Sequence, residues 1–201
     1  MVRPILVCIE GNIGCGKSTV LRELRARGHT VFFEPLEDWK YIFNPFCQDP
    51  QKHCFAFQIQ VVASFADQLW QAMQQAKQSN KDNLIFFERS IASAETFVSS
   101  AVSNGWISDL EHQAYQNLVA ATRWDPDMHI FIDVSASTCF DRISQRARPG
   151  EGSISIDRLN QIEAAHEQSN LCAHTVSGVD APNLVADRIL AAASTCASRL
   201  S

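Results

Sequence analysis

The chain lacks the segments that would tie it to a membrane or to a polynucleotide. None of its 201 residues lies in a run of roughly 18 consecutive apolar residues, so we expect no membrane-spanning helix. The net charge is −5 and no block of lysine and arginine is present, so a nucleic-acid polymer is not an expected partner. An apolar strand begins by Ile5, which leaves no room for a signal or transit peptide. We therefore expect a cytoplasmic protein.

Paired cysteines and spaced histidines are missing too. The seven cysteines are scattered without a Cys-x-x-C pair, which predicts reduced thiols rather than a disulfide framework. The six histidines show no metal-ligand spacing, so no zinc site is predicted. Repeats and low-complexity linkers are also absent. With 46% apolar and 19% charged residues, this favours one globular domain over residues 1–201.

Glycine is scarce, yet three of the 8 glycines fall within six residues of each other. The sequence G-N-I-G-C-G-K-S-T follows the apolar run 5–9 directly. Glycines at these positions let backbone N–H groups converge on a phosphate, and the following helix points its positive dipole end at the same anion. Lys17 adds a positive charge, and Ser18 offers a hydroxyl to Mg²⁺. The predicted nucleotide-phosphate ligands are Gly11, Asn12, Ile13, Gly14, Cys15, Gly16, Lys17, Ser18 and Thr19; the alternative is a glycine-rich turn without a ligand.

Apolar strands alternate with helical segments along the rest of the chain. The pattern predicts strands at 5–10, 30–34, 83–88, 128–133 and 173–177. It predicts helices at 18–27, 51–79, 90–104, 108–122, 136–145, 155–169 and 182–199, with a loop over 35–50. This order indicates an α/β fold with a five-stranded parallel sheet flanked by helices, and with ligands at the carboxyl ends of the strands.

Two of those strand ends carry charged residues. The second strand ends at Glu34, and the third ends at Glu88 followed by Arg89. Phosphoryl transfer needs a base for the attacking hydroxyl, a metal and cations on the transferred group. Glu34 is the candidate base, Glu88 a candidate for the Mg²⁺ shell, and Arg89 a candidate cation for the acceptor. The alternatives are a capping role for Glu34 and a structural salt bridge for the pair 88–89.

Three arginines gather at the end of the helix 136–145 and in the polar segment that follows. Arg142 and Arg146 are four residues apart and share a helix face, and Arg148 follows in the loop. Guanidinium groups on such a segment predict a lid, about 146–153, that closes over the phosphate and excludes water. A solvated cationic helix end is the alternative.

Taken together, the motifs resemble the deoxyribonucleoside kinase family over most of the chain. Those that carry the resemblance are the loop 11–19, E-P-L-E-D-W at 34–39, Phe57-Gln58, E-R-S at 88–90 and R-A-R-P-G-E at 146–151. The resemblance implies a three-layer P-loop kinase fold and transfer of phosphate from ATP, with Mg²⁺, to the 5′-hydroxyl of a deoxynucleoside. It implies catalytic roles for Lys17, Glu34, Arg89, Arg142, Arg146 and Arg148, and metal roles for Ser18 and Glu88. It also implies a homodimer.

The same resemblance assigns an acceptor pocket. Trp39 and Phe57 would form walls around the base, Gln58 would read its edge, and Glu151 would contact the sugar 3′-hydroxyl. Val61, Phe65, Ala94 and Val98 would complete the pocket, with Glu34 and Arg89 at its reacting end. Asp180 lies where the family places its adenine-binding loop. Without the resemblance, the aromatics would be ordinary core residues and Gln58 a surface residue of a long helix.

Departures from the family pattern refine this expectation. Cys47 replaces a tyrosine that hydrogen-bonds the sugar, so sugar recognition falls to Glu151 or to Tyr41. Ala94 replaces an aspartate of deoxycytidine and deoxyguanosine kinases, which favours thymidine, deoxycytidine or a broad range of substrates. Phe65 replaces a residue that is often arginine or methionine, and its bulk narrows the pocket. The alternatives are a thymidylate-type nucleoside monophosphate kinase and a nucleotide-binding protein without catalysis.

Overall fold

The strands form a five-stranded parallel sheet. The computed structural model describes residues 3–78, 84–148, 151–167, 169 and 174–200. The strands are β1 (Ile5–Glu10), β2 (Thr30–Phe32), β3 (Leu84–Glu88), β4 (Met128–Asp133) and β5 (Thr175–Ser177), in the order β2-β3-β1-β4-β5. The predicted strands are confirmed, although β2 ends at Phe32, which leaves Glu34 in the loop beyond it. Positions 83 and 173 of the predicted strands lie outside the described residues.

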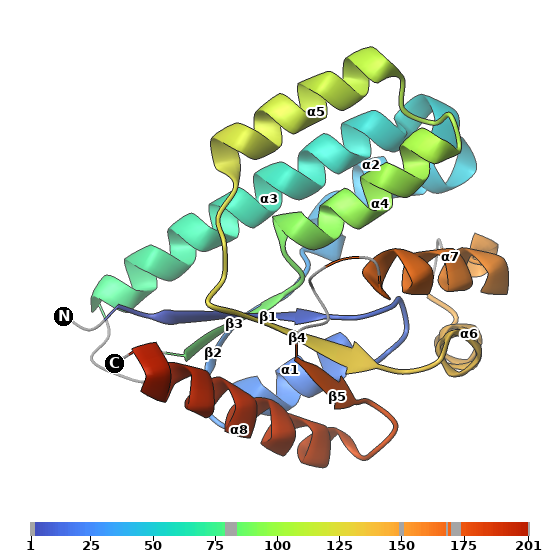
Figure 1. Ribbon diagram of the computed structural model, residues 1–201. Coiled ribbons are helices and arrows are strands. Elements are labelled where there is room, and N and C mark those ends of the chain that lie inside the picture. The colour runs from blue at the N-terminus through green and yellow to red at the C-terminus, as the bar shows by residue number, and fades with distance from the viewer. Residues whose placement is uncertain (1–2, 79–83, 149–150, 168, 170–173, 201) are drawn as a thin grey trace.

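Strand β1 is buried on both faces, which explains its uninterrupted apolar run. Ile5, Val7 and Ile9 face one large core, whereas Leu6 and Cys8 face another. In the parallel register, Ile9 pairs with Glu88 of β3 and with Ile130 of β4. The carboxyl ends of neighbouring strands therefore lie at one edge of the sheet (Figure 1).

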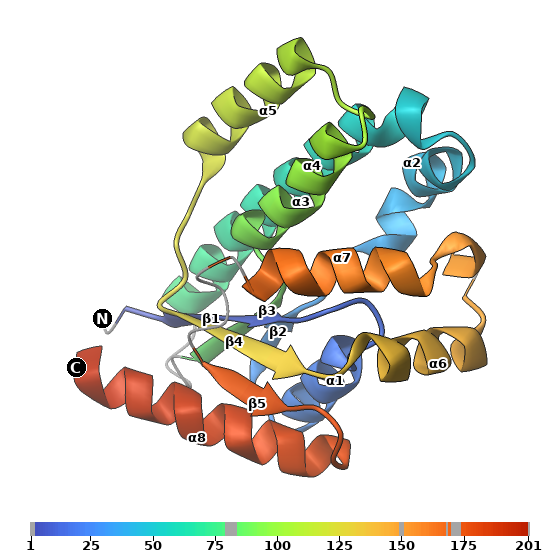
Figure 2. The same cartoon turned by 45° about the vertical axis from the view of Figure 1, so that its right-hand side comes forward.

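Helices cover both faces of the sheet. α1 (Lys17–Ala26) and α8 (Pro182–Leu200) pack together on one face, and α3 (Pro50–Gln78), α4 (Ile91–Ser103) and α5 (Asp109–Thr122) pack together on the other (Figure 2). α6 (Ala136–Arg146), the short 3₁₀ helix η1 (Glu151–Ser153) and α7 (Ile156–Glu167) lie near the carboxyl edge of the sheet (Figure 1). Among the described residues, no helix combines the length and the apolar character that crossing a bilayer requires.

The predicted loop over 35–50 is wrong, because Leu36–Gln48 forms a helix, α2. The loop was predicted from the richness of this segment in proline, asparagine and aromatic residues, but Pro35 only precedes the helix, and Pro45 lies inside it. Aromatic packing offsets the hydrogen bond that Pro45 cannot donate. Phe46 stacks on Phe57 of α3 at 5.0 Å, and Trp39 meets the same ring edge-on at 5.8 Å.

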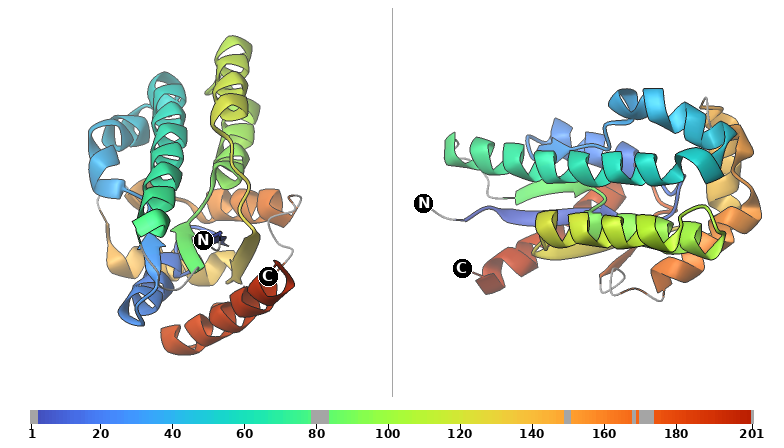
Figure 3. Two further views of the ribbon diagram at one scale, coloured as in Figure 1. Left: turned by 90° about the vertical axis from the view of Figure 1, so that its left-hand side faces the viewer. Right: turned by 90° about the horizontal axis from the view of Figure 1, so that it is seen from above.

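The helices α2 to α5 have a core of their own beside the sheet. It contains Trp39 from α2, Phe57 from α3, Val98 from α4 and Tyr115 from α5, each buried. Viewed along the sheet, these helices form a block that stands away from the strands (Figure 3). The edge of the sheet and this helical block together frame the site described next.

Candidate active site

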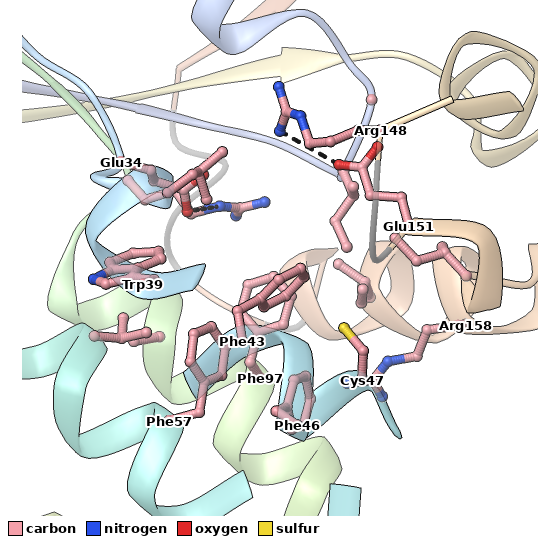
Figure 4. A pocket seen from close by; sticks show the side chains of 18 of the residues that line it. Glu34, Trp39, Phe43, Phe46, Cys47, Phe57, Phe97, Arg148, Glu151 and Arg158 are labelled. Atoms are coloured by element: carbon pink, nitrogen blue, oxygen red, sulfur yellow. Dashed lines mark hydrogen bonds and ion pairs between the residues drawn. The ribbon is translucent and has the colours of Figure 1, made fainter. Parts of the chain in front are cut away.

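A cavity of about 700 Å³ opens at the carboxyl edge of the sheet. Such a volume suits a small-molecule ligand. Its walls come from the phosphate loop, from the ends of β2 and β3, and from α2, α3, α4 and α7. Glu34, Arg89, Arg148 and Glu151 lie toward the sheet and the end of α6, while aromatic rings and Arg158 of α7 lie on the helical side (Figure 4). The cavity is thus mainly polar at one end and mainly aromatic at the other.

The backbone of the phosphate loop depends on glycine. Gly11, Gly14 and Gly16 have φ angles of 139°, 84° and 109°, which residues with a side chain rarely adopt. A Cβ at Gly14 would lie 2.7 Å from the carbonyl oxygen of Cys139. Lys17, the first residue of α1, is buried and donates from Nζ to the carbonyl oxygens of Gly11 (3.0 Å) and Asn12 (2.8 Å). These bonds fix its ammonium group within the loop.

The predicted metal residues contact each other directly. The Ser18 hydroxyl donates to Glu88 Oε1 at 2.6 Å. Glu88, at the end of β3, also accepts from the backbone N–H of Glu34 through Oε2 at 3.4 Å. Oxygen ligands of this kind are the ones that Mg²⁺ prefers. The loop, β2 and β3 therefore converge on one carboxylate.

Glu34 and Arg89 form a shielded ion pair at the same edge. Arg89 Nε lies 3.0 Å from Glu34 Oε1, and the two side chains are only 6% and 18% exposed. Burial raises the pKa of Glu34, while the Arg89 charge lowers it, and the net effect is a pKa above the ordinary value. A carboxylate whose pKa moves toward neutrality is better suited to accept a proton.

Arg89 adopts an unusual backbone conformation. Its φ is 69°, in the left-handed region, and its backbone N–H donates to the carbonyl oxygen of Ile9 at 3.1 Å. Its guanidinium lies 4.9 Å from the centre of the Phe97 ring. The next residue, Ser90, caps α4 and donates to the buried carboxylate of Glu10 at 2.8 Å. The start of α4 and the preceding strands thus hold the guanidinium in place.

Glu10 belongs to a buried polar group beneath the loop. Cys8, Glu10 and His129 place their ligand atoms within 4.8 Å of one another, because Cys8 pairs with His129 in the sheet register. Burial opposes the charge of Glu10, but its contact with His129 and the charge of Arg89 lower its pKa. Burial and the Glu10 charge raise the pKa of the Cys8 thiol well above its ordinary value, which disfavours a metal-binding thiolate. Because Glu10 accepts from Ser90 and lies near the Arg89 charge, we interpret this group as support for the start of α4.

The three predicted lid arginines occupy two different environments. Arg142 donates to the carbonyl oxygens of Cys15 (2.9 Å) and Gly178 (3.2 Å), so it joins the phosphate loop to the loop after β5, and it does not line the cavity. Arg146 instead forms a two-bond pair with Glu151 at 2.7 and 2.6 Å. Arg148 lies 3.4 Å from the same carboxylate. Residues 149 and 150 of the predicted lid lie outside the described part of the chain.

The structure brings most of the predicted ligands together. The predicted residues that line the cavity are Ile13, Gly14, Gly16, Lys17, Ser18, Thr19, Glu34, Trp39, Phe57, Gln58, Val61, Phe65, Glu88, Arg89, Ala94, Arg146, Arg148 and Glu151. Gly11, Asn12 and Cys15 are in the loop but behind the cavity wall. Gln58, expected on the surface without the family resemblance, is 5% exposed.

Three further predicted residues lie away from the cavity, in addition to Arg142 and the three loop residues behind its wall. Val98 is buried in the helical core and does not line the cavity, whereas its neighbour Phe97 does. Tyr41 is 67% exposed and donates its hydroxyl to Gln60 at 2.9 Å, which removes it as the replacement for a sugar-binding tyrosine. Asp180 pairs with Arg188 at 2.6 Å on the far side of the phosphate loop, in the turn before α8.

The sequence reasoning missed several cavity residues, among them Phe43, Phe46, Phe97, Trp106 and Arg158. A signal existed for two of them, because positions 39, 43 and 46 follow helical spacing within the segment taken as a loop. For the others, helical phase and tertiary packing decide which face meets the cavity.

Comparisons with known proteins agree with this geometry. Residues 7–188 match the model of the deoxynucleoside kinase family. The thymidine kinase of Ictalurid herpesvirus 1 is 30% identical over 207 residues, covering 92% of this chain and 84% of that one. Protein 029R of Invertebrate iridescent virus 3, named as a candidate kinase, is 30% identical over 177 residues and 88% of each chain. The solved deoxyadenosine kinase from M. mycoides shares the fold with a TM-score of 0.80 at 23% identity, over 95% of this chain and 100% of that one.

Proposed function

The chain belongs to the deoxynucleoside kinase family, and we propose that it transfers the γ-phosphate of ATP to the 5′-hydroxyl of a deoxyribonucleoside. Members of this family are phosphotransferases with an alcohol group as acceptor. The observation that carries the proposal is the shielded pair of Glu34 and Arg89 beside the phosphate loop. This pair opens onto a cavity with aromatic walls.

Glu34 acts as the base in the proposed reaction. Its carboxylate accepts the proton of the 5′-hydroxyl as that oxygen bonds to the γ-phosphorus and the bond to the β-phosphate oxygen breaks. Arg89 holds the carboxylate in place through one N–H and presents the rest of its guanidinium to the acceptor. Among the described residues, Arg89 Nη1 is buried without a hydrogen-bond partner, so it is available to a ligand oxygen.

Positive charge stabilises the transferred group. Lys17 is held within the phosphate loop by bonds to loop carbonyl groups, while Arg146 ends α6 and Arg148 follows it. Mg²⁺ fits beside them, because Ser18 and Glu88 already place a hydroxyl and a carboxylate oxygen in contact. When bound, the ion would neutralise charge on the phosphates. Lys17, Arg146 and Arg148 therefore act on the phosphates, and Glu34 and Arg89 act on the acceptor.

The acceptor base occupies the aromatic end of the cavity. Trp39, Phe57 and Phe97 supply flat apolar surfaces, and the Gln58 amide offers both a donor and an acceptor to a base edge. Ala94 adds no charge beside this amide, and Phe65 restricts the depth of the pocket. These features favour pyrimidines, with thymidine and deoxycytidine as the expected substrates.

Three further features belong to the proposal by family resemblance. ATP places its adenine near the turn that contains Asp180, Mg²⁺ accompanies it, and the enzyme is a cytoplasmic homodimer. The relevant binding measurement is isothermal titration with ATP, with and without Mg²⁺, on wild type and on Ser18→Ala.

The decisive test measures ADP release from ATP with thymidine, deoxycytidine or thymidine monophosphate as acceptor. The expected result is turnover with one or both nucleosides. Turnover with the monophosphate alone would overturn the proposal in favour of a thymidylate-type kinase. A protein that binds ATP but gives no turnover with any deoxynucleoside would be a nucleotide-binding protein without catalysis.

A further inference from the structure

Arg158 brings an unneutralised guanidinium into the wall of the cavity. It lies near the start of α7, and its side chain is half-buried. One nitrogen, Nη1, donates to the Ser100 hydroxyl of α4, and the guanidinium lies 5.7 Å from the centre of the Trp106 ring. Within the described ranges it forms no ion pair with a carboxylate. Arg146 and Arg148, by contrast, share Glu151.

Such a cation has hydrogen-bonding capacity left over. Burial lowers the pKa of Arg158, yet an arginine stays protonated at neutral pH because its ordinary pKa exceeds 12. A guanidinium carries five N–H donors, and a hydroxyl and an aromatic face occupy only part of them. A buried or half-buried charge without full compensation favours binding of a ligand oxygen.

The position of Arg158 indicates which part of the acceptor it meets. The 5′-hydroxyl belongs beside Glu34, and the base belongs between the rings of Trp39 and Phe97. The polar group of a deoxynucleoside that remains is the 3′-hydroxyl of the sugar. Among the polar residues that line the cavity, Glu151, Cys47 and Arg158 lie on the side away from Glu34 (Figure 4).

The thiol in this wall is a poor hydrogen-bond donor. Cys47 lies beside Arg158 and points into the cavity (Figure 4). Burial raises the pKa of its thiol, and Glu151 raises it further, so the sulfur stays protonated and weakly polar. Its short side chain leaves space next to the guanidinium that a larger residue would fill. Arg146 and Arg148 share the Glu151 carboxylate, so among the described residues Arg158 is the guanidinium of this cavity wall that no carboxylate neutralises.

We propose that Arg158 is a specificity-determining residue that donates a hydrogen bond to the 3′-oxygen of the acceptor sugar. This inference rests on the proposed function and adds the recognition of one substrate atom. It predicts that nucleosides lacking a 3′-oxygen are poor acceptors because they leave the guanidinium unsatisfied.

The test combines a protein change with a substrate change. kcat/KM is measured for the best deoxynucleoside and for its 2′,3′-dideoxy counterpart, in wild type, Arg158→Met, Arg158→Lys and Ser100→Ala. Methionine keeps much of the bulk without a donor, and lysine keeps the charge. Ser100→Ala removes the contact between α7 and α4 and retains the guanidinium, so it is the matched control for a purely structural role.

We expect wild type to prefer the 3′-hydroxyl substrate, and Arg158→Met to reduce that preference about tenfold or more, as for loss of a charged hydrogen bond. Arg158→Lys should retain part of the preference for the 3′-hydroxyl substrate, and Ser100→Ala should leave that preference unchanged. An equal loss for both substrates in Arg158→Met would assign Arg158 a structural role and overturn the inference. If Arg158→Met fails to fold, an unchanged preference in Arg158→Leu, which also lacks a donor, overturns it instead. Absence of wild-type turnover with every deoxynucleoside would instead refute the proposed function, and this inference with it.

Discussion

The two ends of the cavity are built in different ways. At the sheet edge, backbone geometry positions the chemistry: the loop turns at glycines, Lys17 bonds to loop carbonyls, and Glu88 accepts from Ser18 and from a backbone N–H. At the helical side, packed side chains such as Phe46, Phe57 and Trp39 form the wall. We therefore propose that the sheet edge sets the rate of transfer and that the helical wall sets the choice of acceptor.

Of the variants that test this contrast, Lys17→Met has the largest expected effect. Removing the buried ammonium should lower kcat/KM by about 10³-fold or more for every acceptor, because charge on the transferred phosphoryl group loses its partner. Steady-state kinetics with two acceptors measures the loss. Lys40→Met, which removes an exposed ammonium paired with Glu37, is the matched control and should be neutral. A kcat/KM of Lys17→Met within tenfold of the wild-type value would contradict the proposal that the sheet edge sets the rate of transfer.

Glu34→Gln should have the next largest effect. We expect kcat to fall about 10²-fold or more, since the amide cannot accept the proton. In wild type, kcat should fall as the pH drops through the raised pKa of Glu34, because only the ionised form is a base. A pH–rate profile measures both effects, with Glu37→Gln as control. If kcat of Glu34→Gln still falls at low pH, a group other than Glu34 causes that fall.

At the helical wall, Ala94→Asp should change preference more than rate. Ala94 is 3% exposed and lines the cavity. A carboxylate there accepts from the amino group of cytosine and repels the O4 carbonyl of thymine. We expect kcat/KM to fall about tenfold more for thymidine than for deoxycytidine. Ser99→Asp on the exposed face of α4 is the control. Equal losses for the two substrates would show that position 94 does not discriminate.

The smallest expected effect concerns the stability of the fold, at a residue that does not line the cavity. His166 of α7 is buried, and burial lowers its pKa to about 4. Below pH 6.5 the unfolded chain binds a proton at this position that the folded chain does not. Stability should therefore decline between about pH 6.5 and 4, by on the order of 2–3 kcal/mol from this residue. Urea unfolding across that range should show a shallower decline in His166→Leu than in wild type or in His174→Leu, at an exposed position. Parallel declines in all three would assign the pH dependence elsewhere.

The sheet edge was predictable because its signals are local. The loop 11–19 is contiguous, and Glu34 and Glu88 directly follow apolar runs. The parallel sheet then brings these strand ends to one edge without further information. The order of the residues alone predicted that these groups would lie together. The structure adds the contacts between them, such as the hydrogen bond from Ser18 to Glu88.

The helical wall was only partly predictable because it depends on phase and packing. One residue along a helix rotates a side chain by about 100°, which separates buried Val98 from cavity-lining Phe97. α2 was missed because the richness of this segment in proline, asparagine and aromatic residues predicted a loop and did not reveal the aromatic contacts made after folding. Arg142 faces carbonyl groups rather than the cavity, and Arg158 was not singled out at all. The spacing of charged residues along the chain does not predict which way the side chains of Arg142 and Arg158 point.

The left-handed backbone at Arg89 bears on any attempt to make this enzyme more heat-resistant. A residue with a side chain at φ 69° costs of order 1–3 kcal/mol, and glycine avoids that cost. Replacement by glycine would also leave the Glu34 carboxylate, which is only 18% exposed, without its partner, and breaking a shielded ion pair in this way costs about 3–5 kcal/mol. Heat selection should therefore keep the arginine despite its strained backbone, so a screen for thermostability alone favours the same side chain that the proposed reaction uses.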